Sequence, residues 1–304
     1  MSYTKIKSHA KINLALNIVG KSKILHKIES IVSFLDLHDE IQIKKVNQKY
    51  NEVRFFGKFS SGINSKNTVS QLLENIEKKK LLKDKYQIII KKNIPSKAGL
   101  GGGSMNAASI LNFFIKKKLI KIKKKEIIEL SKTIGSDVIL GLYLKNLVLK
   151  GNGAIKTISS SRKFYTLLVK PSFGCSTKKI YSKVKKFHKP EFTSISNNFM
   201  SVDYLSNKKN DLELIAIESY PRLKSLKNFL VKLPNAKFVR MTGSGSTMIA
   251  YFNSSESCTR YSAASTSSTI VNDEAELVPV LARSSPCSAC KSSSERACRN
   301  KSTL

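Results

Sequence analysis

A glycine-rich segment contains the residue types that most clearly suggest chemistry. Its residues, in order, are Pro95, Ser96, Lys97, Ala98, Gly99, Leu100, Gly101, Gly102, Gly103 and Ser104. Four glycines within five positions let the backbone approach an anion with no Cβ in the way, and successive N–H groups can then form a nest for phosphate oxygens. We therefore predict a phosphate-binding loop, in which the Ser104 hydroxyl is available to a phosphate or to a phosphate-bound Mg²⁺ ion.

Two expected elements position this loop. Residues 86–92 have the composition of a strand, and the apolar spacing of residues 104–118 predicts a helix whose positive end would face a bound phosphate. The glycines are not followed by the Lys-Ser/Thr pair of a Walker A loop, and they lack the spacing of a dinucleotide-binding motif. A glycine run alone could be a plain turn, but its place between a strand and a helix favours phosphate binding.

The rest of the pattern predicts an α+β fold with two domains, at residues 1–160 and 161–252. Ahead of the loop, period-two alternation predicts a meander of short strands at 12–18, 28–35 and 41–43. Other expected elements are helices at 67–82, 124–134, 177–184, 211–219 and 222–230, a hairpin at 147–158, strands at 165–170, 238–242 and 247–252, and a polar loop over 186–208.

The composition changes after residue 252. Ser, Thr, Arg and Cys become frequent and Lys almost vanishes, so we interpret residues 253–304 as an atypical, disordered tail and consider a shifted reading frame as its origin. Four of the five cysteines lie there: Cys258, Cys287, Cys290 and Cys298. Cys287 and Cys290 have the spacing of a zinc half-site, but no second pair and no nearby histidine accompany them, so we expect no metal there.

The charge of the chain is strongly positive. Its 304 residues include 54 Lys+Arg against 21 Asp+Glu, a formal net charge of +33, which can indicate binding to nucleic acid or to a membrane surface. Nearly all the excess is Lys, scattered in short groups and accompanied by many Ile and Asn, so we interpret it as a composition bias that at most steers anionic substrates. Only one cysteine, Cys175, lies before residue 253, the N-terminus is unlike a secretory signal, and no long apolar run occurs. We therefore predict a cytoplasmic protein.

The glycine-rich segment resembles the second motif of the GHMP kinases, P-x-x-x-G-L-G-x-S-S-x-x-A, with one extra glycine. The stretch from Ala10 to Leu14 is similar to the N-terminal motif of that superfamily, and the stretch from Arg240 to Gly245 is similar to its C-terminal glycine motif. The resemblance implies a GHMP kinase fold. In that fold a ribosomal-protein-S5-like N-terminal α/β domain packs on a C-terminal α+β domain, with the site in the cleft between them.

Further segments resemble the branch of this family whose substrate is 4-diphosphocytidyl-2-C-methyl-D-erythritol. They are His26 with residues 30–39, residues 135–138, residues 151–153, Lys170-Pro171 with Thr177, and residues 210–213. The resemblance implies transfer of the γ-phosphoryl group of ATP, with Mg²⁺, to the 2-hydroxyl of that compound in non-mevalonate isoprenoid synthesis. It also implies a monomer or homodimer with no specific nucleic-acid partner and no membrane partner. Three alternatives stay open: a homoserine- or mevalonate-type kinase, a nucleic-acid-binding protein, and a decayed, inactive kinase.

The resemblance also assigns roles by position. Asp137 would orient the substrate hydroxyl or take its proton, and Lys11 would stabilise the transferring charge, which suits a reaction that depends on positioning and cations. Without the family, these two would be a turn aspartate and a surface lysine. His26 would contact the cytosine and Tyr181 would stack on it. The other implied contacts are Pro95, Ala98, Gly99, Leu100, Gly101, Gly102, Gly103, Ser104 and Asn67 with ATP, and Asn13, Thr177, Gly243 and Ser244 with the substrate.

The chain departs from the family pattern at several places. Leu25 stands where the family has Tyr and cannot stack, so we expect weaker or differently shaped cytidine binding. Met105 replaces a serine, which removes a hydroxyl expected beside the phosphates. Lys97 and Ala98 replace two glycines, and Lys97 could reach a phosphate, although a solvent-facing lysine is the default expectation. The last helix and strand of the family are not found in residues 253–304, so we expect an incomplete second domain with an uncovered sheet edge.

Overall fold

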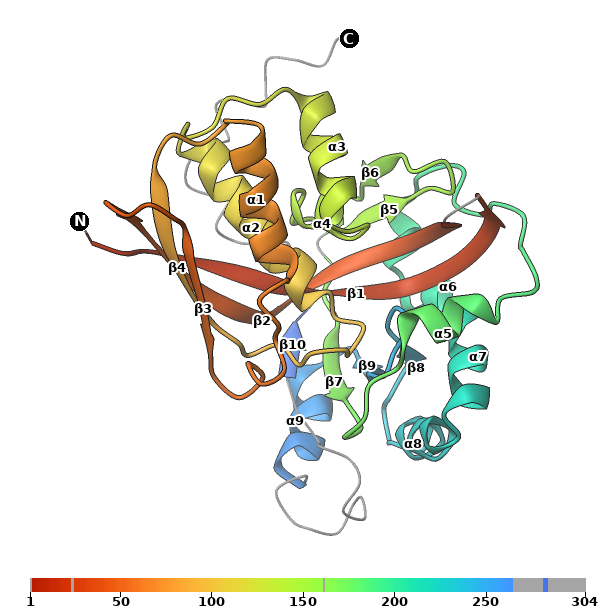
Figure 1. The fold of residues 1–304 in the computed structure, drawn as a ribbon. Coiled ribbons are helices and arrows are strands. Elements are labelled where there is room, and N and C mark those ends of the chain that lie inside the picture. The colour runs from red at the N-terminus through yellow and green to blue at the C-terminus, as the bar shows by residue number, and fades with distance from the viewer. Residues whose placement is uncertain (1, 23–24, 161, 265–280, 284–304) are drawn as a thin grey trace.

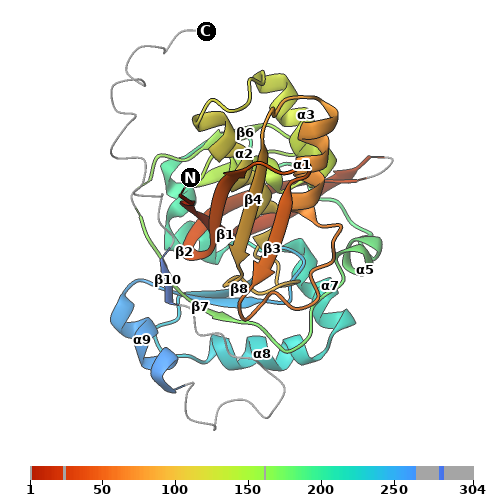
Figure 2. The same ribbon diagram turned by 60° about the vertical axis from the view of Figure 1, so that its left-hand side comes forward.

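The computed structural model describes residues 2–22, 25–160, 162–264 and 281–283. Two β-sheets, one of six strands and one of four, lie side by side, and helices cover the outer face of each (Figures 1 and 2). Apolar residues of both sheets, among them Ile12, Leu168 and Ile249, share one buried cluster, so the two halves are held together by a common core. The division at residue 160 stays a prediction. Among the described helices, none combines the length and apolar character needed to cross a membrane.

The larger sheet is built on a long hairpin. Strands β1 (Thr4–Lys21) and β2 (His26–Val46) pair antiparallel, and β4 (Lys85–Lys91), β3 (Glu52–Phe56), β5 (Leu147–Leu149) and β6 (Ile155–Thr157) complete the order β3-β4-β2-β5-β6, with β1 on β2. Strand β3 runs parallel to β4 and was not expected from the sequence. The predicted strands at 86–92 and 147–158 are confirmed to within about two residues at their ends.

Strand β2 corrects one prediction, because the strands expected at 28–35 and 41–43 are a single element of 21 residues. Polar residues, among them Asp36, Asp39 and Glu40, lie between the two expected strands. However, Asp39 is fully buried, accepts hydrogen bonds from the backbone N–H groups of Asn93 and Ile94, and forms an ion pair with Lys92. A buried carboxylate with these partners does not interrupt the strand, and partners that lie more than 50 residues away in the chain cannot be inferred from local alternation.

Four helices pack on one face of this sheet: α1 (Thr68–Lys78), α2 (Gly102–Lys116), α3 (Lys124–Ile134) and the short α4 (Val138–Gly141). Their apolar side chains meet those of β2 and β4 in a second buried cluster. Asn67 caps α1, since its side chain accepts hydrogen bonds from the backbone N–H groups of Val69 and Ser70. Helix α2 begins at Gly102 rather than at Ser104, so two of the glycines lie inside its first turn.

The smaller sheet has the order β10-β7-β9-β8, with every pair antiparallel. Its strands are β7 (Tyr165–Val169), β8 (Phe238–Met241), β9 (Met248–Phe252) and β10 (Leu281–Arg283), and the helices of this half include α5 (Thr177–Ser182), α7 (Asp211–Ser219) and α8 (Arg222–Val231). The polar stretch 186–208 is not a plain loop, because it contains a 3₁₀ turn at Asn197–Met200 and helix α6 (Val202–Ser206). Buried Phe192 and Leu205 attach this stretch to the core.

The prediction that the last helix and strand are missing is wrong. Helix α9 (Ser255–Ala264) follows β9, and β10 covers the edge of β7, with Leu281 opposite Leu167 and Arg283 opposite Tyr165. Composition misled here, because the fully buried Cys258 of α9 packs as a small apolar residue in the core of this half. The disorder expected elsewhere in the tail and the half-site at Cys287 and Cys290 lie outside the described residues, as does Cys298.

Candidate active site

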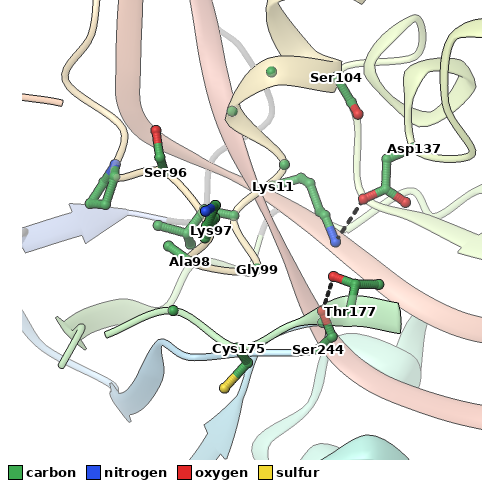
Figure 3. A pocket seen from close by; sticks show the side chains of 18 of the residues that line it. Lys11, Ser96, Lys97, Ala98, Gly99, Ser104, Asp137, Cys175, Thr177 and Ser244 are labelled. Atoms are coloured by element: carbon green, nitrogen blue, oxygen red, sulfur yellow. Dashed lines mark hydrogen bonds and ion pairs between the residues drawn. The ribbon is translucent and has the colours of Figure 1, made fainter. Parts of the chain in front are cut away.

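A pocket of about 830 Å³ lies between the two halves, below the amino-terminal end of α2 (Figure 3). The glycine-rich loop forms one side of it, the start of α4 another, and the loops before α5 and between β8 and β9 the rest. Most of the predicted site residues line it. They are Lys11, Asn13, Pro95, Ala98, Gly99, Leu100, Gly101, Gly102, Gly103, Ser104, Asp137, Thr177, Tyr181, Gly243 and Ser244.

Two glycines of the loop are required by close approach to other segments. Gly99 has a φ of +75°, and a Cβ there would lie 2.1 Å from the carbonyl oxygen of Thr242. Gly101 has a φ of +69°, and a Cβ there would lie 2.8 Å from Cγ of Lys11, whose backbone N–H also donates to the carbonyl of Leu100. The loop is thereby pressed against both the first strand and the C-terminal glycine motif, which brings the three sequence motifs together.

Lys11 and Asp137 form an ion pair at the centre of the pocket. Nζ of Lys11 lies 3.1 Å from Oδ2 of Asp137 (Figure 3). It also donates a hydrogen bond of 2.7 Å to Oδ1 of Asn13. The Lys11 side chain is 5% exposed and that of Asp137 is 29% exposed, so the lysine is held inside while the carboxylate can be reached from the pocket. A fixed cation beside an accessible carboxylate can orient a hydroxyl group and stabilise negative charge that develops next to it.

Asn13 connects this pair to both halves of the molecule. Its side-chain amide donates to the hydroxyl of Ser30, and its backbone N–H donates to the hydroxyl of Thr242 at 3.1 Å. Across the pocket, the hydroxyl groups of Thr177 and Ser244 lie 2.8 Å apart (Figure 3). The polar side chains around the pocket are therefore held in place by hydrogen bonds before any ligand binds. Ser176 caps α5, since its side chain accepts a hydrogen bond from the backbone N–H group of Lys179.

An aromatic cluster adjoins the pocket. The ring centroid of His26 lies 5.2 Å from that of Tyr181 and 6.3 Å from that of Phe187. Burial and the nearby Lys21 lower the pKa of His26, so its ring is neutral at pH 7, while burial and Asp137 raise the pKa of Tyr181. The Phe187 ring is 49% exposed, so it offers an apolar face beside His26 to a flat ligand.

Two predicted site residues, Asn67 and His26, do not line the pocket itself. The Asn67 side chain caps α1, and its role in nucleotide binding stays a prediction. His26 contacts Tyr181, which does line the pocket. The structure also changes the interpretation of Met105. This side chain points into the core against Gly141, because neighbouring positions on a helix face different directions, so the serine missing there is not a lost hydroxyl in the pocket.

Sequence reasoning missed several lining residues. Thr68 donates from its hydroxyl to the carbonyl of Gly103 at 2.7 Å, and Lys92 Nζ lies 3.3 Å from where a Cβ on Gly102 would stand. Cys175 and Tyr220 also line the pocket, and burial raises the pKa of the Cys175 thiol to about 11, so it is not an activated nucleophile near neutral pH. Only Thr68 carried a local signal, since it stands at the start of an expected helix.

The loop fits a triphosphate, since Gly101, Gly102 and Gly103 line the pocket at the start of α2, where the backbone N–H groups of the first turn have no partner within the helix and can bind an anion. Within the described part of the chain, no group of three or more His, Cys, Asp or Glu side chains could hold a metal ion by itself. A Mg²⁺ ion would therefore be held largely by phosphate oxygens, with the hydroxyl of Ser104 and the carboxylate of Asp137 as the available protein oxygens.

The chain is similar to known kinases in sequence. Residues 67–143 match the family described as GHMP kinases N terminal domain. The chain is 53% identical over 259 residues to the 4-diphosphocytidyl-2-C-methyl-D-erythritol kinase of Pelagibacter ubique. The matched region covers 85% of this chain and 92% of that protein. It is 31% identical over 268 residues to the kinase of the same name from Clostridium tetani, and this match covers 84% of this chain and 94% of that protein.

A solved structure gives the same result for the fold. The crystal structure of a 4-(cytidine 5'-diphospho)-2C-methyl-D-erythritol kinase matches with a TM-score of 0.71 and 21% sequence identity, over 86% of this chain and 94% of that chain. At this identity the likeness shows the fold alone, and the sequence identities carry the family assignment. The chain therefore belongs to the 4-diphosphocytidyl-2-C-methyl-D-erythritol kinase family of the GHMP kinases.

Proposed function

We propose that the chain transfers the γ-phosphoryl group of ATP to the 2-hydroxyl of 4-diphosphocytidyl-2-C-methyl-D-erythritol. The observation that carries the proposal is the ion pair between Lys11 and Asp137, which lies at 3.1 Å in the pocket below the glycine-rich loop. The choice of substrate is supported by the 53% sequence identity between the chain and the 4-diphosphocytidyl-2-C-methyl-D-erythritol kinase of Pelagibacter ubique. Isoprenoid precursor synthesis is the pathway that the activity implies.

The reaction depends on positioning and charge. Asp137 accepts a hydrogen bond from the substrate hydroxyl and aims its oxygen at the γ-phosphorus, and it can take the proton as the new bond forms. Lys11 faces the negative charge that spreads over the transferring group, and Asn13 keeps the lysine in place through the 2.7 Å hydrogen bond. The backbone N–H groups at the start of α2 hold the phosphates, and Mg²⁺, when bound, neutralises part of their charge.

The aromatic cluster beside the pocket is the proposed site for the cytosine ring. Tyr181 and Phe187 both contact His26, and neutral His26 can donate or accept a hydrogen bond at the edge of a base. Leu25 is 63% exposed and offers no aromatic face, so Phe187 is the exposed ring that can stack on the base in its place. This arrangement favours a cytidine substrate over homoserine or mevalonate, neither of which contains a ring to stack.

A substrate panel tests the proposal. The purified chain is assayed for ATP consumption with 4-diphosphocytidyl-2-C-methyl-D-erythritol, homoserine and mevalonate as acceptors, with Mg²⁺ present. We expect turnover with the cytidylyl compound alone. Turnover with homoserine or mevalonate but not with the cytidylyl compound would refute the proposed substrate, and DNA affinity that falls steeply with salt, without ATP turnover, would favour the nucleic-acid alternative. The predicted cytoplasmic location and the monomeric or dimeric state remain predictions.

A further inference from the structure

Lys97 is a cation at the phosphate loop that the mechanism above does not use. It lies between Ser96 and Ala98 on the loop, lines the pocket, and has its side chain exposed, across the pocket from Lys11 and Asp137 (Figure 3). Among the described residues, none forms a salt bridge or a side-chain hydrogen bond with its ammonium group. The ammonium group is therefore available to a ligand.

The backbone at this position does not favour a lysine. Lys97 has a φ of +52°, in the left-handed region where glycine is unstrained and a residue with a Cβ is not. Gly174 lies directly against it, because a Cβ added to Gly174 would stand 2.7 Å from Cβ of Lys97. The lysine thus carries a conformational cost, and it needs a glycine opposite to make room.

We infer that Lys97 binds the triphosphate of ATP as a second cation, on the opposite side of the phosphates from Lys11. The inference rests on the proposed function. ATP is the expected ligand because Lys97 belongs to the loop whose glycines leave backbone N–H groups open to phosphates, whereas His26 and Tyr181 lie on β2 and α5. An exposed lysine on a flexible stem contacts ground state and transition state alike, so it strengthens ATP binding with little effect on the chemical step.

Three variants of Lys97 and one control test this role. Lys97→Met removes the charge, Lys97→Arg keeps it, and Lys97→Gly removes the charge and relieves the backbone. The control is Lys80→Gly, because Lys80 is also an exposed lysine, with a φ of +51°, but it follows the far end of α1 and does not line the pocket. The measurements are KM for each substrate, kcat, direct binding of ATP and of adenosine, and the melting temperature.

We expect Lys97→Met and Lys97→Gly to raise KM and Kd for ATP about three- to ten-fold, as for one partly exposed charge-assisted contact, with kcat changed less than two-fold. Lys97→Arg should retain ATP affinity, and adenosine, which has no phosphates, should bind all variants equally. The difference for ATP should shrink as the salt concentration rises. Lys97→Gly should melt no lower than the parent protein, as should Lys80→Gly, because glycine relieves the positive φ at both positions.

The pairing of weaker ATP binding with unchanged or higher melting temperature separates a ligand contact from a structural role. Unchanged ATP affinity in Lys97→Met overturns the inference while leaving the proposed function intact, provided that the parent protein binds ATP. A rise in KM for the cytidylyl substrate alone also overturns it, because the lysine would then serve the other ligand. A parent protein that binds no ATP refutes the proposed function and the inference together.

Discussion

The replacement Asp137→Asn tests the centre of the proposed mechanism. It keeps the shape of the side chain but removes the negative charge next to Lys11. At 3.1 Å and an effective dielectric constant of about 20, the attraction between the two charges is about 5 kcal/mol before the cost of desolvating them is counted. Hydration lost by the buried Lys11 offsets part of this attraction, and solvent at the partly exposed Asp137 screens more of it, so we expect a net loss of stability of about 2 kcal/mol.

The effect on turnover should be much larger than the effect on stability. Loss of a carboxylate that orients and deprotonates the hydroxyl should lower kcat about 100- to 10,000-fold. The melting temperature should fall by only a few degrees, about 4 °C, so the protein remains folded during the assay.

The control is Asp203→Asn, an equivalent change at an exposed position in the first turn of α6, outside the pocket. It should leave kcat and both KM values unchanged. The reasoning is refuted if Asp137→Asn retains kcat within about two-fold of the parent chain, since neither proton transfer nor orientation by this carboxylate could then matter. A double-mutant cycle with Lys11→Met adds a second check, because additive effects would mean that the two groups do not act as a pair.

Three further predictions concern the loop and the base site. Gly99→Ala should destabilise the protein by about 3 kcal/mol in denaturant unfolding, because of its positive φ and because the new Cβ would lie 2.1 Å from the carbonyl oxygen of Thr242. The control, Gly62→Ala, has a φ of +74° with nothing within 4 Å of the new Cβ and should cost about 1 kcal/mol, so equal losses would contradict the packing argument. Phe187→Ala should raise KM for the cytidylyl substrate at least about five-fold and leave KM for ATP unchanged, and an unchanged substrate KM would remove Phe187 from the base site. Burial holds the pKa of His26 below its ordinary value of 6.5, so the ring is mostly neutral at pH 7 and above. The substrate KM should therefore be constant between pH 8 and 7 and rise only in more acidic solution; a rise that begins above pH 7 and disappears in His26→Asn would show that the pKa is not lowered.

Local pattern was sufficient for the elements with regular apolar spacing. Helices α3 and α7 begin and end at the residues expected for them, because their apolar spacing and the residues at their ends specify both. The glycine-rich loop was found for a similar reason, since four glycines between a strand and a helix have few other uses. The motif at Lys11 and the residue Asp137 were identified only through the family resemblance.

The errors occurred where distant segments decide the burial of a residue. Asp39 lies within a strand because Lys92 and the backbone after β4 satisfy its carboxylate, and Cys258 belongs to a core helix because β7 and β9 leave an apolar site for it. Neither partner set can be inferred from neighbouring residues. The same holds for Met105, whose direction into the core was settled by the orientation of α2 against α4.

By itself, the sequence determined that a phosphate loop lies between a strand and a helix, and its motifs indicated the family and the order of the site. Tertiary structure alone decided that the loop presses on both Lys11 and Thr242, that Lys11 and Asp137 lie 3.1 Å apart, and that Phe187 stands beside His26. The physical reason is that backbone conformation and apolar periodicity depend on adjacent residues, whereas the distance between two side chains depends on how separate segments of the chain pack together.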